Sequence, residues 1–153
     1  HLHFDDEQGG PMDLSSRLQQ QQWGAVYACG PAPMLDALTA ATAHWTSGSV
    51  RMERFKGAEV STSGRKPFEL KLQKSGLSTT VNENESVLDA MERLGVDYPW
   101  SCREGICGTC EASVLSGEVQ HLDFVLTPEE RAEQRRMMVC VSRCGGGSLV
   151  LDI

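Results

Sequence analysis

The stretch SCREGICGTC, residues 101–110, decides how the rest of this sequence is interpreted. It places cysteines at positions 102, 107 and 110 in a C-x4-C-x2-C spacing, and a fourth cysteine follows at position 140. This is the plant-type 2Fe–2S spacing. Two irons bridged by two sulfides need four thiolates in one small volume, so three come from one tight loop and the fourth from elsewhere in the fold. We therefore predict Cys102, Cys107, Cys110 and Cys140 as the cluster ligands.

Two glycines separate the first three cysteines, at Gly105 and Gly108. Glycine accepts a positive φ and carries no Cβ, so the backbone can curl closely around a cluster and direct N–H groups at its sulfurs. We expect N–H groups near Arg103, Gly105, Gly108 and Thr109 to tune a low reduction potential, about −400 mV by analogy with plant-type ferredoxins. Tyr98 and Trp100 would shield the cluster, or simply pack in the core.

Other uses of the cysteines remain open at this point. Cys140 and Cys144 form a C-x3-C pair, so a structural zinc site built from two cysteine pairs is not excluded by counting. A disulfide framework suits a small secreted domain, and no signal peptide is in view. A Rieske centre needs two histidine ligands, a pattern that is absent here. Cys144 is interpreted as a thiol that binds no metal.

The charge of the chain bears on its partners. The formal net charge is −7, and residues 67–153 contain 8 Lys and Arg against 14 Asp and Glu. Nucleic-acid binding needs a basic face, so that class of partner is excluded. An acidic surface suits either steering toward a basic redox partner or mere solubility. No apolar run approaches the roughly 18 residues that a membrane helix needs, so we expect no membrane partner.

The N-terminal part of the chain predicts a small α/β unit. A short strand is expected at residues 1–4, followed by a turn over residues 5–11. The apolar run WGAVYAC (residues 23–29) predicts a buried strand, residues 33–45 a helix and residues 50–55 a second strand. A strand, a helix and a strand form a parallel βαβ crossover, and such sheets bind ligands beyond the carboxyl ends of their strands.

The C-terminal part predicts a β-grasp arrangement, a sheet crossed by one helix. Two alternating segments around Ser75-Gly76 predict a hairpin. Ser86 and Asp89 resemble a capping box that opens a helix ended by Gly95. Residues 112–121 are expected to form a further strand pair around a turn. Thr127 is expected to cap a short helix that ends at Arg135, and residues 149–153 to form a buried closing strand.

Three motifs together carry a family resemblance: SCREGICGTC, the later run MMVCVSR (residues 137–143) and the terminal LVLDI. They resemble the C-terminal ferredoxin domain of phthalate dioxygenase reductase-like proteins, the reductase components of Rieske-type oxygenases. Upstream, Cys29-Gly30-Pro31 resembles the Cys-Gly-Pro motif of ferredoxin-reductase-like nicotinamide domains. The segments HFDDE (residues 3–7) and ERF (residues 53–55) are similar to this family as well.

The resemblance implies an α+β chain in three parts. Residues 1–55 would be the end of an NAD(P)-binding reductase domain, residues 56–66 a flexible linker, and residues 67–153 the plant-type 2Fe–2S ferredoxin domain. The complete protein would be a cytoplasmic electron carrier. In it, NAD(P)H and FMN or FAD would supply electrons, and a Rieske-type oxygenase would receive them. Cys29, Gly30 and Pro31 would lie near the nicotinamide, and Phe55 would stack on the flavin; the alternative for Phe55 is an ordinary interface aromatic.

Two features that the resemblance implies are missing from this sequence. Residues 1–66 contain no glycine-rich phosphate turn between a strand and a helix, and they leave no room for a flavin-binding barrel. We therefore expect the sequence to start midway through the nicotinamide domain and to lack NAD(P)H turnover by itself. The alternatives are a free-standing ferredoxin and a zinc-binding module.

Overall fold

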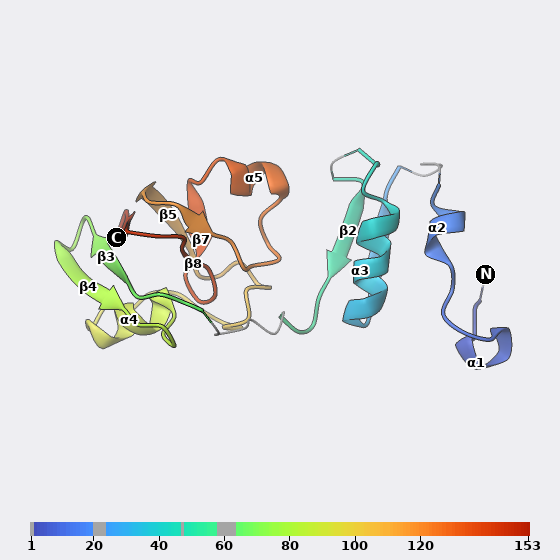
Figure 1. Ribbon diagram of the computed structural model, residues 1–153, viewed down its shortest axis with the longest axis horizontal. Helices are drawn as coiled ribbons and strands as arrows, with labels where there is room; N and C mark the ends of the chain where they lie inside the picture. Colours follow the sequence, from blue (N-terminus) through green and yellow to red (C-terminus); the bar gives the residue numbers. More distant parts are fainter. Residues whose placement is uncertain (1, 20–23, 47, 58–63) are drawn as a thin grey trace. The chain divides into compact units, whose positions relative to one another are not determined.

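The computed structural model describes residues 2–19, 24–46, 48–57 and 64–153. The chain divides into two compact units, His1–Phe55 and Lys56–Ile153. Each unit has its own hydrophobic core, and each is described by itself below (Figure 1). The expected linker, residues 56–66, lies partly outside the described residues.

The smaller unit contains the expected parallel crossover. Strands β1 (Val26–Cys29) and β2 (Val50–Glu53) pair in parallel, with Val26 opposite Val50 and Cys29 opposite Glu53. Helix α3 (Ala32–Ala41) connects them, and two single-turn helices precede them, α1 (Asp5–Gln8) and α2 (Leu14–Arg17). The crossover prediction is confirmed.

The prediction of a strand at the start of the chain is wrong for the described residues 2–4, which form no regular element. Helix α1 follows at once, with three acidic residues in its first turn and Gly9 ending it at φ +80°. Acidic side chains interact favourably with the partial positive charge of a helix N-terminus, and the residues expected to form a turn therefore support a helical turn.

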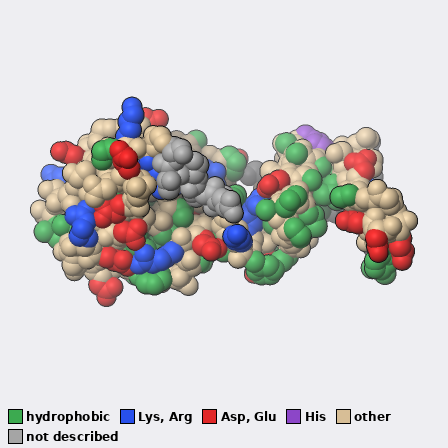
Figure 2. All heavy atoms as spheres, turned by 60° about the horizontal axis from the view of Figure 1, so that its bottom comes forward, with side chains coloured by type: hydrophobic (Ala, Val, Ile, Leu, Met, Phe, Trp, Pro, Cys, Tyr) green, Lys and Arg blue, Asp and Glu red, His purple; other side chains and the backbone are tan. Residues whose placement is uncertain are grey.

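The prediction that residues 23–29 form a fully buried strand is also wrong. Trp23 lies outside the described residues, and along β1 exposure alternates, with Val26 and Ala28 partly buried and Tyr27 77% exposed. The buried face packs on a small core of Leu18, Leu38 and Trp45, while the other face has no covering element among the described residues. Hydrophobic side chains accordingly reach the surface of this unit (Figure 2).

The larger unit is built on a five-stranded mixed sheet in the order β4-β3-β9-β5-β7. Its strands are β3 (Phe68–Leu72), β4 (Leu77–Val81), β5 (Glu111–Ser116), β7 (Arg136–Met138) and β9 (Ser148–Leu151). The predicted β3–β4 hairpin is confirmed, and the closing strand β9 is buried and runs parallel to β3 at the centre of the sheet. A separate pair joins β6 (Val119–Gln120) to β8 (Arg143–Cys144).

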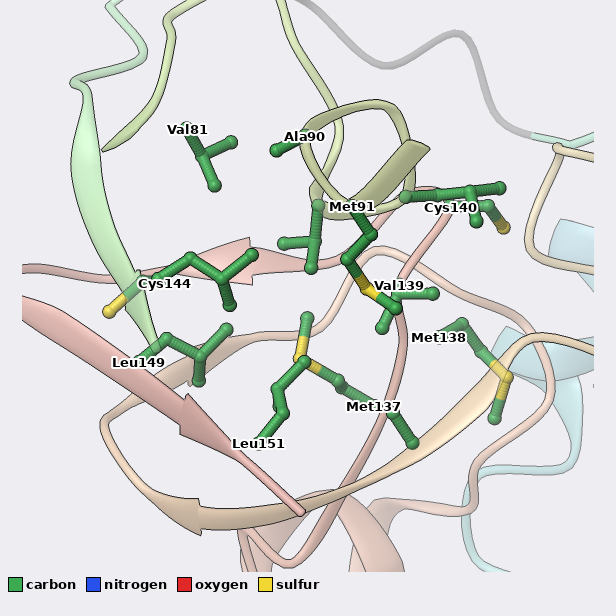
Figure 3. Packing of buried hydrophobic residues seen from close by; sticks show 14 of the residues in the cluster. Val81, Ala90, Met91, Met137, Met138, Val139, Cys140, Cys144, Leu149 and Leu151 are labelled. Carbon is green, nitrogen blue, oxygen red and sulfur yellow. The ribbon is translucent and has the colours of Figure 1, made fainter. Parts of the chain in front are cut away.

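The core of this unit lies between the sheet and helix α4 (Val87–Arg93). Phe68, Leu70 and Leu72 of β3 are buried in strict alternation with exposed neighbours. Side chains from the helix and from the strands meet there, as Met91, Met137 and Leu151 do in Figure 3. The hydrophobic face of the strand, with its period of 2 residues, and that of the helix, with its period of 3.6 residues, therefore face the same core.

Both helices of the larger unit begin with capping boxes. The Ser86 hydroxyl accepts the Asp89 N–H at 3.0 Å, and the Asp89 carboxylate accepts the Ser86 N–H at 3.0 Å. Thr127 and Glu130 form the same reciprocal pair at the start of α5 (Pro128–Ala132). Helix α4 ends before Gly95, whose φ is +79°. The predicted helix starts are confirmed, while α5 stops earlier than the sequence indicated.

The expected strand pair within residues 112–121 is wrong in its partners. Strand β5 pairs with β7 and β9, and β6 pairs with β8 instead of returning along β5. Gly117 adopts φ +112° between them, and a Cβ there would lie 2.6 Å from the carbonyl oxygen of Ser148. Contact with the central strand β9 therefore directs the chain away from a simple hairpin.

Across the described part of the chain, every helix is too short or too polar to cross a lipid bilayer.

We expect Ser86→Ala to lower the free energy of unfolding of the larger unit by about 1 kcal/mol, because the N–H of Asp89 loses its acceptor. Chemical denaturation followed by circular dichroism at constant cluster content measures this difference. Ser78→Ala, on the exposed face of β4, is the matched control and should stay within about 0.5 kcal/mol of the parent chain. Equal losses in the two variants would contradict the capping role.

Candidate metal centre

Helix α4 and strand β5 hold the two ends of the cysteine loop. On the helix side, the Val96 N–H donates to the carbonyl of Met91 at 3.0 Å. On the strand side, the Tyr98 hydroxyl donates to the carbonyl of Glu111 at 2.6 Å. These contacts join residues before the loop to the core helix and to the strand that leaves the loop.

Arg103 fastens the middle of the loop to α4. Its guanidinium donates to the Asp89 carboxylate at 2.8 Å and also to Glu92. The same guanidinium lies over the Trp100 ring, 4.1 Å from the ring centroid. Because Arg103 is itself at φ +57°, these contacts hold a backbone conformation that non-glycine residues adopt rarely. The sequence did not indicate this role, since neither acidic partner lies in the loop.

The tight curvature depends on Gly105, which is buried at φ +69°. A Cβ there would lie 2.6 Å from Val141 Cγ2 and 3.1 Å from Asp123 Cα. The Gly105 carbonyl accepts the Phe124 N–H at 2.9 Å, so a second segment lies directly against the loop. Gly105 is therefore required both for its conformation and for the space.

A buried carboxylate supports that second segment. Asp123 is 2% exposed, and its Oδ1 accepts the N–H groups of Val125 and Leu126 at 3.0 and 2.8 Å. Its other oxygen lies 3.4 Å from the Ser142 hydroxyl, two residues after Cys140. Asp123 was not singled out from the sequence, where an isolated aspartate carries no signal of burial.

The four predicted ligand thiols lie together as two pairs. Cys110 and Cys140, 30 positions apart, have their sulfurs 3.1 Å from each other, and both are buried. Cys102 contributes to the lowered pKa of Cys107, and charge interactions link Cys107 to Cys110 and Cys102 to Cys140. Each iron of a 2Fe–2S rhomb takes two thiolates, so two neighbouring pairs are the arrangement that this cluster needs.

N–H and O–H donors surround the sulfurs. The Glu104 N–H donates to Cys102 Sγ at 3.3 Å, and the Gly105 N–H donates to Cys140. The Thr109 hydroxyl and N–H both donate to Cys107. Donors at Gly105 and Thr109 were expected, whereas that at Glu104 was not. Such donors stabilise negative charge on sulfur.

These donors and neighbours change the acidity of the free thiols. The Thr109 hydroxyl, followed by backbone N–H groups, lowers the pKa of Cys107 to about 6. A hydrogen bond with Cys140 lowers the pKa of Cys110 to about 7, and the pKa of Cys140 is raised in return because the pair shares one proton. At neutral pH the loop therefore already holds thiolate, the form that binds iron.

The aromatic residues beside the loop differ in exposure. Tyr98 is half-buried, and burial together with the nearby Cys110 and Glu111 raises the pKa of its hydroxyl. Trp100 is 46% exposed, and Cys107 is exposed as well. One side of the loop thus faces solvent, while Cys110 and Cys140 face the core.

Cys144 lies apart from this group. It is buried on β8, and its thiol donates to the carbonyl of Gly146 at 3.1 Å. Figure 3 shows Cys140 and Cys144 at opposite sides of the core. The second C-x3-C pair of a zinc site is therefore not formed.

In the smaller unit, Cys29, Gly30 and Pro31 lie at the carboxyl end of β1, with Pro31 at the N-cap of α3. Cys29 is exposed beside a hollow of about 300 Å³ that is also lined by Tyr27, Arg51 and Glu53. Phe55, the last residue of this unit, is 73% exposed. These positions are open to a ligand.

The fold and the cysteine site of the larger unit define a 2Fe–2S ferredoxin domain. A family model described as "2Fe-2S iron-sulfur cluster binding domain" matches residues 70–145. Over the full chain, 82% of residues are identical to the toluene-4-sulfonate monooxygenase system reductase subunit of Comamonas testosteroni. The chain spans 48% of that relative's length.

Two solved structures are similar over almost the whole chain. An intact type IV self-sufficient cytochrome P450 monooxygenase has a TM-score of 0.81 and 40% identity, covering 96% of this chain and 20% of that one. Phthalate dioxygenase reductase has a TM-score of 0.66 and 36% identity, covering 94% of this chain and 44% of that one. This chain belongs to the phthalate dioxygenase reductase-like family, and its ferredoxin domain is of the 2Fe–2S type.

In the cluster-free protein, we expect Cys107 to react with iodoacetamide faster than Cys140, because its lowered pKa leaves it largely thiolate at neutral pH. The Cys107 rate should be half its maximum near pH 6 and level off above about pH 7. Mass spectrometry of the labelled peptides measures both rates. Thr109→Val removes the hydroxyl donor and should move the midpoint toward the ordinary value; an unmoved midpoint would contradict the assigned cause.

Proposed function

We propose that this chain is the electron-delivering part of a reductase component. Cys102, Cys107, Cys110 and Cys140 hold a 2Fe–2S cluster, which accepts and releases one electron at a time when bound. The observation that carries the proposal is the assembly of these thiols as two neighbouring pairs. In this role the chain would be part of an oxidoreductase.

The residues around the sulfurs have separate tasks in this function. Donors at Glu104, Gly105 and Thr109 stabilise negative charge on the thiolates and so set the reduction potential. Val141 and Asp123 lie so near Gly105 that no side chain fits there, and this close packing restricts movement of the loop. Exposed Cys107 marks the side from which an electron leaves to an acceptor.

The electron source is proposed to be NAD(P)H acting through FMN or FAD in the complete reductase. Residues 1–55 would form the end of the NAD(P)-binding domain, with Cys29, Gly30 and Pro31 near the nicotinamide and Phe55 against the flavin. The solved phthalate dioxygenase reductase is described as a modular structure for electron transfer from pyridine nucleotides to [2Fe–2S], which supports this order. The exposure of Cys29 and Phe55 is compatible with these contacts.

The electron acceptor is proposed to be a Rieske-type oxygenase component. The Comamonas relative is named as a reductase subunit of a monooxygenase system, which supports an oxygenase as the partner. An acidic ferredoxin domain would approach a basic site on that partner, at a rate that falls as salt rises.

We expect the reconstituted protein to be red-brown and to lose this absorption when Cys102, Cys107, Cys110 or Cys140 is replaced by serine. Visible absorption and electron paramagnetic resonance of the dithionite-reduced protein measure the cluster. Cys144→Ser is the matched control, since this thiol is buried at the opposite side of the core, and Cys29→Ser is a second. A colourless parent protein that contains zinc would contradict the proposal.

The second prediction concerns the electron source. The chain of residues 1–153 should accept one electron from dithionite but show no NADH-dependent turnover, even with added FMN, because residues 1–66 lack a phosphate-binding glycine turn. Cytochrome c reduction measures the turnover. NADH-dependent turnover without an added reductase would contradict the prediction that residues 1–153 cannot take electrons from NADH by themselves.

A further inference from the structure

A buried hydroxyl lies two residues beyond Cys140, the last of the four cluster ligands. Ser142 is fully buried, and its N–H donates to the carbonyl of Met138 at 2.9 Å. The Val141 N–H donates to the same carbonyl at 3.2 Å. These two hydrogen bonds close the turn that contains Cys140, so the Ser142 side chain has a fixed place relative to the backbone of that ligand.

The Ser142 hydroxyl binds a distant segment of the chain by two hydrogen bonds. It accepts the Leu122 N–H at 3.2 Å and donates to Asp123 Oδ2 at 3.4 Å, across 20 and 19 positions of sequence. The ring of His121 lies near the same oxygen, but its Nδ1 is 3.6 Å away, too far for a hydrogen bond. Among the described residues, Ser142 is therefore the side chain that joins the Cys140 turn to Asp123 Oδ2.

The Asp123 segment is itself held in one conformation. Asp123 Oδ1 accepts the N–H groups of Val125 and Leu126, and the Arg131 guanidinium donates to the Asp123 carbonyl. Buried polar groups whose hydrogen bonds are all made are costly to move. The carboxylate therefore gives the Ser142 hydroxyl a rigid point of attachment.

The same segment lies directly against the cysteine loop. The Phe124 N–H donates to the Gly105 carbonyl at 2.9 Å, and a Cβ on Gly105 would lie 3.1 Å from Asp123 Cα. The Gly105 N–H in turn donates to Cys140. The contacts therefore form a closed circuit that starts at Cys140, passes through the Asp123 segment and returns by way of Gly105.

We propose that Ser142 is a positioning residue for the cluster, because its hydroxyl sets how the Cys140 turn lies against Gly105. The inference rests on the proposed function and adds a residue to it. A serine with a purely structural role would need only some acceptor in the core, whereas both partners of this hydroxyl belong to the segment that contacts Gly105. Without the hydroxyl, the Leu122 N–H loses its acceptor and the Cys140 turn can move away from the cysteine loop.

The hydrogen bond from Gly105 to Cys140 makes this position measurable as a reduction potential. An N–H donor on a ligand sulfur stabilises negative charge, and the reduced cluster carries one negative charge more than the oxidised cluster. Weakening this hydrogen bond therefore disfavours the reduced state and makes the midpoint potential more negative.

The first test compares Ser142→Ala with the parent chain of residues 1–153 after reconstitution of the cluster. The variant should have a more negative midpoint potential and an altered visible circular dichroism spectrum, because the surroundings of the Cys140 sulfur change. A redox titration and the dichroism spectrum of the oxidised protein measure these quantities. An unchanged potential overturns the proposal, whatever happens to the stability of the variant.

Two further variants separate positioning from a general loss of stability. Val81→Ala removes buried volume from β4, a strand that contains no ligand, and it should lower the melting temperature while leaving the potential unchanged. Ser142→Thr keeps the hydroxyl and should restore the parent potential. An equal shift of potential in Val81→Ala overturns the proposal, and so does a threonine variant that behaves like Ser142→Ala.

Hydrogen exchange gives a reading that does not depend on the cluster. In the chain of residues 1–153, Ser142→Ala should speed exchange of the peptides that contain Leu122 and Gly105 about fivefold, the factor that one hydrogen bond of ordinary strength contributes. Exchange in the β3–β4 hairpin should keep the parent rate. Mass spectrometry of the digested protein measures these rates. Unchanged exchange at Gly105 overturns the proposal, even where Leu122 alone becomes faster. A parent protein that binds no iron would instead contradict the proposed function, and it would still answer this exchange measurement.

Discussion

The larger unit depends on one constraint, the gathering of four thiols into one small volume. A chain meets it only by turning sharply between cysteines, and Gly105 makes that turn where a Cβ would lie 2.6 Å from Val141 Cγ2 and 3.1 Å from Asp123 Cα. No larger residue fits there. The two segments that crowd Gly105 come from the parts of the chain before and after α5, so the loop is formed by the completed fold and not by its own sequence.

The sheet and helix α4 serve this loop as a rigid base. The side chains packed between the sheet and the helix are buried. Arg103 joins the loop to this base through its ion pairs with Asp89 and Glu92 of the helix. The sulfurs then divide by exposure, with Cys140 in the core and Cys107 at the surface. A cluster bound between them would be anchored by a buried ligand and would stay accessible to a redox partner through the exposed one. A protein that exchanges single electrons needs both.

Much of the local structure could be predicted, because its causes lie within a few residues. The β3–β4 hairpin follows from alternation around Ser75-Gly76, and the start of α4 follows from Ser86 and Asp89. The errors are of another kind. Strand β6 was assigned to the wrong neighbour because its pairing with β8 joins residues more than 20 positions apart. Likewise, hydrophobic residues in β1 indicated burial, but the described residues provide a covering element for one face only.

The sequence by itself determined the cofactor class, since the spacing of Cys102, Cys107 and Cys110 suits a cluster whatever the surrounding fold. It also determined the helix caps and turns, which arise from neighbouring residues. Only the tertiary structure decided that Cys140 meets Cys110, that Cys144 lies across the core, and that Ser142 contacts Asp123. Such contacts join residues distant in the chain, and packing of the whole unit, which no local pattern encodes, brings them together.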